Sequence, residues 1–132
     1  MTNRDRIRER YLKDALPVRL AGLAADLSRV ASSARRATGA AAAAAMLEES
    51  QYLIEWTAAE APVEIAEELV NLQVMLALWR RAWPDAQHNQ LQRSLLAVQA
   101  KQWADQIMRQ CENFPSGSGL AEFDPPQAEE VI

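Results

Sequence analysis

Two stretches of the chain repeat apolar residues at alternating spacings of three and four, which places the side chains on one face of a helix. The first stretch runs through Leu16, Leu20, Leu23, Leu27, Val30 and Ala34, and the second runs through Ile65, Leu69, Leu72, Leu76, Trp79 and Trp83. Period-two alternation never persists, and strand-forming residues are sparse. The pattern therefore predicts an all-α protein, built as an antiparallel four-helix bundle.

Residues that start and stop helices divide the chain into four expected segments. Pro17 and Pro62 suit the first turn of a helix, where the missing N–H costs nothing, and Gly39 is a stop signal. Pro84 is expected to end the third helix, and Asp85 is a good N-cap for the fourth. The six alanines at 40–45 favour the first turns of the second helix. The expected helices span residues 17–37, 41–60, 62–83 and 86–113.

Both ends of the chain differ in composition from its middle. Residues 4–15 are rich in arginine and predict a short basic helix or arm at the N-terminus. From Pro115 the chain becomes rich in Pro, Gly and Ser and then acidic, which is typical of a disordered tail. We therefore predict a helical bundle domain over residues 1–114 and a flexible acidic tail over residues 115–132.

The third expected helix carries a second row of apolar residues on the side opposite its first. This row consists of Val63, Val70, Val74 and Leu78. A helix that is apolar on two faces is buried on two faces, either at the centre of a monomer or in an interface between subunits. We favour a homo-oligomer with this row in the interface, and a dimer is the commonest such assembly.

The second expected helix carries a strip of acidic and aromatic residues on the edge of its buried face. Glu49, Tyr52, Trp56 and Glu60 lie within about 80° of one another at the helical step of 100° per residue. One hypothesis makes this strip a binding ridge for a basic partner or a cationic ligand. The alternative, which we favour, is a helix flank where the aromatic rings seal the core and the carboxylates face water.

Charge is unevenly spread along the chain, whose net charge is −4. Residues 1–40 hold nine basic and four acidic side chains, whereas residues 41–132 hold five basic and fourteen acidic ones. We favour internal pairing of the basic N-terminal segment with the acidic middle helices. An accessory nucleic-acid binder that contacts phosphates through Arg4, Arg6, Arg8 and Arg10 is the alternative, which an acidic whole disfavours.

No constellation of residues indicates catalysis or a cofactor. The chain has one histidine, His88, and one cysteine, Cys111, and on the predicted fourth helix the two lie about 35 Å apart. Metal sites in helix bundles combine Glu with Glu-x-x-His pairs, and no Glu precedes His88 by three residues. Phosphate cradles use Gly-rich motifs, and none occurs in the sequence. We therefore predict a non-catalytic interaction protein with no metal and no cofactor. A binder of a hydrophobic or chromophore-like molecule between helices is an alternative, lined by Trp56, Trp79, Trp83 and Trp103.

The expected location is the cytoplasm. A lone cysteine fits a reducing compartment, and the charged N-terminus leads into no apolar signal core. No run of the chain approaches the roughly 20 apolar residues that span a bilayer. We expect no membrane contact, a homodimer as the main assembly, and an unidentified protein partner as a further possibility.

Three segments of the chain resemble a family of small, uncharacterised helical proteins of cyanobacteria. They are the segments at 48–58, 66–73 and 77–83, with the sequences EESQYLIEWTA, AEELVNLQ and ALWRRAW. The shared features are a Glu-Ser-x-aromatic start, a Glu-Trp pair and two tryptophans four residues apart. The resemblance covers about residues 16–112 and implies an all-helical cytoplasmic protein. It carries no activity and no functional residue onto this chain.

Overall fold

The computed structural model describes residues 2–113, which form five α-helices and one 3-10 turn and contain no strand. The α-helices are α1 (Asn3–Leu12), α2 (Leu16–Ala34), α3 (Ala40–Ala58), α4 (Val63–Ala86) and α5 (Gln90–Glu112), and the 3-10 turn η1 (Ala37–Gly39) joins α2 to α3. The prediction of an all-α protein is confirmed. The predicted acidic tail over residues 115–132 lies outside the described residues.

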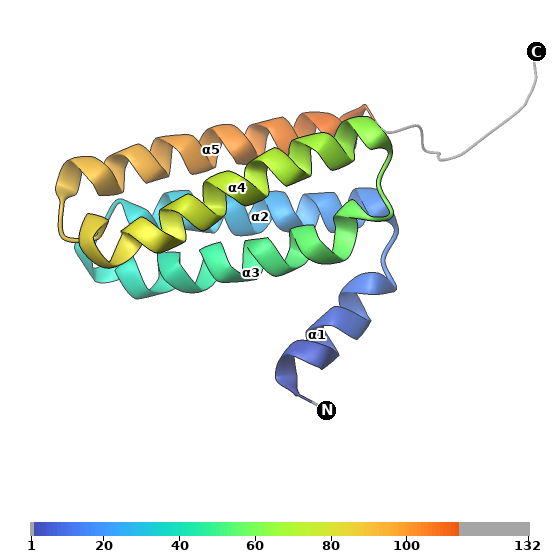
Figure 1. The fold of residues 1–132 in the computed structure, drawn as a ribbon, viewed down its shortest axis with the longest axis horizontal. Coiled ribbons are helices and arrows are strands. Elements are labelled where there is room, and N and C mark those ends of the chain that lie inside the picture. The colour runs from blue at the N-terminus through green and yellow to red at the C-terminus, as the bar shows by residue number, and fades with distance from the viewer. Residues whose placement is uncertain (1, 114–132) are drawn as a thin grey trace, which may run out of the picture.

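The core lies between the four long helices, and α2 contributes the most to it. α2 packs most extensively against α5 and α3, and α3 packs in turn against α4. Figure 1 shows α2 to α5 lying alongside one another, with α1 projecting beyond them at the end where α2 begins. Every residue of the two predicted apolar repeats is buried except Leu16, which is half-buried against the core.

The alanine run at the start of α3 lets two helices approach closely. Ala40 and Ala43 are buried, and their small side chains leave room for the end of α4. The indole Nε1 of Trp83 on α4 donates a hydrogen bond of 2.9 Å to the carbonyl oxygen of Ala40. A polar group of the deepest aromatic residue is thereby satisfied inside the core.

Gly39 does not stop the first long helix where the sequence predicts. α2 ends at Ala34, because Arg36 leaves the helical region at φ −105° and ψ 137° and turns the chain toward α3. Gly39 is instead needed for a close approach of the backbone. A Cβ atom at this position would overlap the carbonyl oxygen of Ser33.

The prediction that Pro84 ends the third helix is also wrong, because α4 continues to Ala86. The missing N–H of Pro84 leaves only the carbonyl of Arg80, on the solvent side, without its helical partner. Trp83 and Ala86 are buried on either side of the proline, and their packing outweighs its poor helix propensity.

Asp85 therefore lies inside α4 and is not the N-cap of the last helix. That position belongs to Asn89, whose side-chain oxygen accepts a 2.9 Å hydrogen bond from the backbone N–H of Gln92. The last helix begins four residues later than the sequence predicts, at Gln90 instead of residue 86.

Candidate functional site

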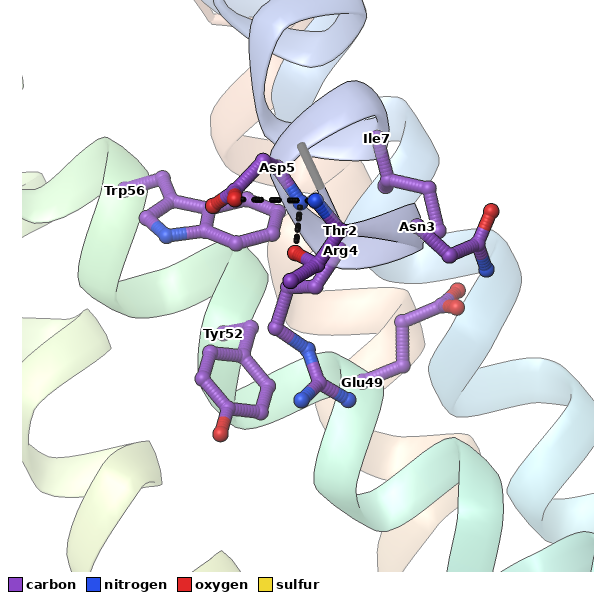
Figure 2. A pocket seen from close by; sticks show the side chains of 8 residues that line it. All are labelled: Thr2, Asn3, Arg4, Asp5, Ile7, Glu49, Tyr52 and Trp56. Atoms are coloured by element: carbon purple, nitrogen blue, oxygen red, sulfur yellow. Dashed lines mark hydrogen bonds between the residues drawn. The ribbon is translucent and has the colours of Figure 1, made fainter.

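The structure brings three of the four predicted ridge residues to one cleft and separates the fourth. Glu49, Tyr52 and Trp56 project from α3 and line a cleft of about 430 Å³ beneath the N-terminal half of α1. Figure 2 shows Tyr52 beside the Arg4 side chain and Trp56 beside Asp5, whereas the Glu49 carboxylate points toward the side on which Asn3 lies. Glu60 lies beyond the end of α3, where it pairs with Arg19 at 3.0 Å.

Aromatic rings form the wall of this cleft on the α3 side. The ring centroids of Tyr52 and Trp56 are 5.7 Å apart. Tyr11 of α1 does not line this cleft, but its ring lies 6.0 Å from that of Trp56. The guanidinium carbon of Arg4 lies 3.9 Å from the centroid of the Tyr52 ring, within the range of a cation–π contact. An Nη atom of Arg4 also lies 3.6 Å from a carboxylate oxygen of Glu48.

A capping box stabilises the start of α1, and hydrogen bonds of Tyr11 hold its end against α2 and α3. The Thr2 hydroxyl accepts from the N–H of Asp5, and the Asp5 carboxylate accepts from the N–H of Thr2. These hydrogen bonds, with Arg8 nearby, hold the pKa of Asp5 below its usual value. The basic N-terminal segment is therefore a capped helix, one of whose arginines faces acidic α3.

The C-terminal end of α1 is tied to both α2 and α3. The Tyr11 hydroxyl lies 2.8 Å from Thr57 Oγ1 and donates or accepts there, and it lies 3.0 Å from the carbonyl oxygen of Arg19. Burial raises the pKa of Tyr11, an effect that the Thr57 hydrogen bond and Arg19 oppose. Arg19 is itself buried and donates to the carbonyls of Leu12 and Asp14. Arg19 comes three residues after Leu16 and four before Leu23, so it lies on the same side of α2 as the apolar row, although sequence reasoning missed it.

A carboxyl pair of which only Asp26 is buried lies behind the cleft, and sequence reasoning missed it. The Asp26 side chain of α2 is only 4% exposed, and its Oδ1 accepts a 2.8 Å hydrogen bond from Arg29. The pKa of Asp26 is raised from 3.8 to about 8, first by burial and then by the neighbouring Glu49 carboxyl, with Arg29 acting in the opposite direction. Asp26 is therefore mostly protonated at neutral pH.

A signal for this pair does exist in the sequence. Asp26 comes three residues after Leu23 and four before Val30, so it lies on the same side of α2 as the apolar row. A carboxylate in that register needs a partner or a proton. Its partner Glu49 comes from a different helix, and sequence spacing does not show which helix packs there.

The predicted interface residues lie together on the outward side of α4. Val63 is 72% exposed, Val70 and Val74 are each 55% exposed, and Leu78 is 56% exposed. They lie opposite the buried repeat, so the helix is apolar on two faces as the sequence indicates. We call these four residues the α4 stripe. Within residues 2–113 the other helices do not wrap this face, because the α4 stripe faces solvent.

The four tryptophans occupy three separate environments. Trp79 and Trp83 pack edge to face in the core at 6.5 Å, and the indole of Trp79 donates to Gln99 at 2.7 Å. Trp56 lines the cleft beneath α1, and Trp103 lines a shallow hollow between α4 and α5. The proposed ligand cavity lined by all four indoles is therefore not formed by the described residues.

Two further findings bear on function. Within residues 2–113, no group of three or more His, Cys, Asp and Glu side chains is placed to hold a metal ion, and no helix is long and apolar enough to cross a bilayer. No protein-family model, curated protein or solved structure matches this chain. The α4 stripe and the cleft beneath α1 are the two candidate binding surfaces of residues 2–113.

Proposed function

We propose that the protein is a non-catalytic helical protein that self-associates as a homodimer through the α4 stripe. The observation that supports this proposal is the exposure of four large apolar side chains, each more than half exposed, on the outward face of one helix. Removing apolar surface from water lowers the free energy by roughly 25 cal/mol per Å². Contiguous exposed patches of this kind usually mark association sites.

The occupant that best fits the α4 stripe is the α4 stripe of a second copy. The row runs nearly along the helix axis over about four turns, so two copies related by a two-fold axis can pack their valines and leucine against each other. A stable interface buries roughly 800 Å² per partner. Leu91, Leu95 and Val98 in the first half of α5 are further exposed apolar residues.

The arrangement that we propose for α2 to α5 is an antiparallel four-helix bundle. Contacts between α4 and α5 support it, because Glu68 bonds to Gln110 whereas Trp79 bonds to Gln99, so the residue numbers run in opposite directions. A contact between α2 and α5 supports it in the same way. The Sγ of Cys111, near the end of α5, lies 3.3 Å from the carbonyl oxygen of Pro17, at the start of α2.

We also propose a cytoplasmic location and membership of the cyanobacterial family that the chain resembles. The lone cysteine supports the location. The Glu-Ser-x-aromatic start, the Glu-Trp pair and the paired tryptophans support the family.

Light scattering coupled to size exclusion at micromolar concentration tests the dimer. One chain has a mass of 14.7 kDa, so the wild type should elute with about twice that mass. Val74→Asp places a charge at the centre of the α4 stripe and should give a monomer with unchanged helix content.

Val18→Asp is the matched control, because Val18 is 54% exposed on α2, away from the α4 stripe. This variant should remain a dimer. A wild-type mass near that of one chain would contradict the proposal, and so would a dimer that Val74→Asp leaves intact.

A further inference from the structure

α1 covers the cleft above α3 without being part of the core. The structure describes all ten residues of this helix, and none of them is buried. Ile7, Tyr11 and Leu12 are half-buried, and the rest face water. A helix of this length has little stability of its own, so its contacts with α3 and the hydrogen bonds of Tyr11 to Thr57 and Arg19 hold it in place.

The cleft already holds a guanidinium group. Arg4 stacks on the Tyr52 ring at 3.9 Å and approaches the Glu48 carboxylate at 3.6 Å. An aromatic face and a carboxylate are the two groups that recognise an arginine side chain. Both partners in the ion pair remain substantially exposed, at 49% and 39%, so this contact is weak enough to exchange.

The acidic side of the cleft also holds a buried polar atom that α1 leaves without a partner. Glu49 lines both the cleft at Arg4 and a second hollow of about 280 Å³, which extends to Asp26. The buried Asp26 Oδ2 has no hydrogen-bond partner among residues 2–113. Arg10 and Arg29 also line this hollow, and of the two only Arg29 bonds to Asp26, through Oδ1.

Charge complementarity indicates what kind of segment belongs in this cleft. The α1 segment carries four arginines against one aspartate and one glutamate. The facing part of α3 and the turn after it carry four glutamates and no basic residue, namely Glu48, Glu49, Glu55 and Glu60. A basic helix is therefore the natural occupant, and α1 is a basic helix that this chain supplies itself.

We propose that the trough formed by Glu48, Glu49, Tyr52 and Trp56 is a binding site for arginine side chains of a partner helix, and that α1 is its tethered intramolecular competitor. Because α1 is joined to α2 by only three residues, it is present at a high effective concentration and reduces the apparent affinity of the partner. Loss of the Arg4 contact raises that affinity. The α4 stripe is not involved, so this proposal stands apart from the proposed dimer.

A synthetic peptide with the sequence of residues 2–13 serves as the arginine-bearing probe. Its binding to the full chain is measured by fluorescence polarisation at low salt. The Arg4→Ala variant should bind the peptide at least about fivefold more tightly than the wild type, because the tethered helix competes less well. Adding Tyr52→Leu to this variant should abolish the gain, since the peptide arginine then has no ring to stack on.

Arg6→Ala is the matched control, because it removes the same charge from an exposed position of α1 that does not line the cleft. It should bind the peptide as the wild type does. A second control is a peptide in which the residue equivalent to Arg4 is glutamine, and this peptide should lose the gain. Circular dichroism checks that every variant keeps the helix content of the wild type.

Three results would overturn the proposal. The first is an equal affinity of the peptide for Arg4→Ala and Arg6→Ala. The second is a gain that persists with the glutamine peptide, which would reflect net charge alone. The third is a higher mass of Arg4→Ala than of wild type in light scattering, which would show that α1 exchanges between copies of this chain.

Discussion

The hydroxyl of Tyr11 lies 2.8 Å from the hydroxyl of Thr57, and this contact joins the end of α1 to the last turn of α3. Thr57 is fully buried, so its side chain has no access to water. Tyr11 therefore connects the peripheral helix α1 to a buried residue of the core.

Tyr11→Phe removes this contact together with the 3.0 Å hydrogen bond to the Arg19 carbonyl, and it leaves the buried Thr57 hydroxyl without that partner. We expect the free energy of unfolding to fall by about 1–2 kcal/mol. Chemical denaturation monitored by circular dichroism measures the change. Tyr52→Phe is the control, because the Tyr52 ring and not its hydroxyl makes the contact with Arg4. A loss of stability as large in Tyr52→Phe would show that the hydrogen bonds of the Tyr11 hydroxyl are not the cause.

Stability should fall as pH rises from about 4 to 8. The pKa of Asp26 is 3.8 when unfolded and about 8 when folded, so in this range the native state binds the extra proton. The contribution is fully present below pH 4 and is lost as pH rises through 8. We expect a loss of roughly 2–4 kcal/mol over this range, an order-of-magnitude figure for a buried carboxyl.

Asp26→Asn should remove most of this pH dependence. The amide cannot ionise, its oxygen can accept from Arg29, and its NH₂ group can donate to Glu49. Urea unfolding of both proteins at pH 5 and at pH 8.5 measures the difference. Asp105→Asn, an exposed change on α5, should keep the wild-type slope. A wild type equally stable at both pH values would contradict the raised pKa.

Two glycine substitutions should have opposite effects. Gly39→Ala forces a Cβ atom against the Ser33 carbonyl oxygen, which is backbone and cannot move aside. It should destabilise the protein by more than 1 kcal/mol. Gly22→Ala lies within α2, where the nearest atom to a new Cβ is Cε1 of Tyr11 at 3.8 Å, an ordinary contact. It should stabilise the protein by about 0.5–1 kcal/mol. Thermal melts of both variants decide, and two changes of the same sign would contradict the geometry.

The sequence predicted the helices whose apolar rows enter the core, and it failed where packing overrides local signals. The repeats ending at Ala34 and Trp83 are confirmed because period and burial agree. Pro84 is a strong local stop signal, but the buried residues beside it hold the helix together. Because the third helix was expected to end at Pro84, the N-cap of the last helix was predicted at Asp85 instead of Asn89.

The candidate sites were predictable in part for a similar reason. The α4 stripe was found because all its members lie on one helix, where spacing fixes their common face. Glu49, Tyr52 and Trp56 were grouped for the same reason. What they face was not predictable, since α1 and Asp26 reach the cleft through tertiary packing, which sequence spacing does not encode.

The bond between Trp83 and Ala40 gives the alanine run a fixed length. The run begins at this anchored residue, and each inserted residue rotates the rest of a helix by 100° and advances it by 1.5 Å. One added or deleted alanine would therefore turn Leu47 and Ile54 away from the core, unless η1 absorbed the change. Replacing the exposed Ala41, Ala42 or Ala45 by another helix former leaves that register intact. In this segment the number of residues is under tighter constraint than their identity, although the sequence looks like simple repetition.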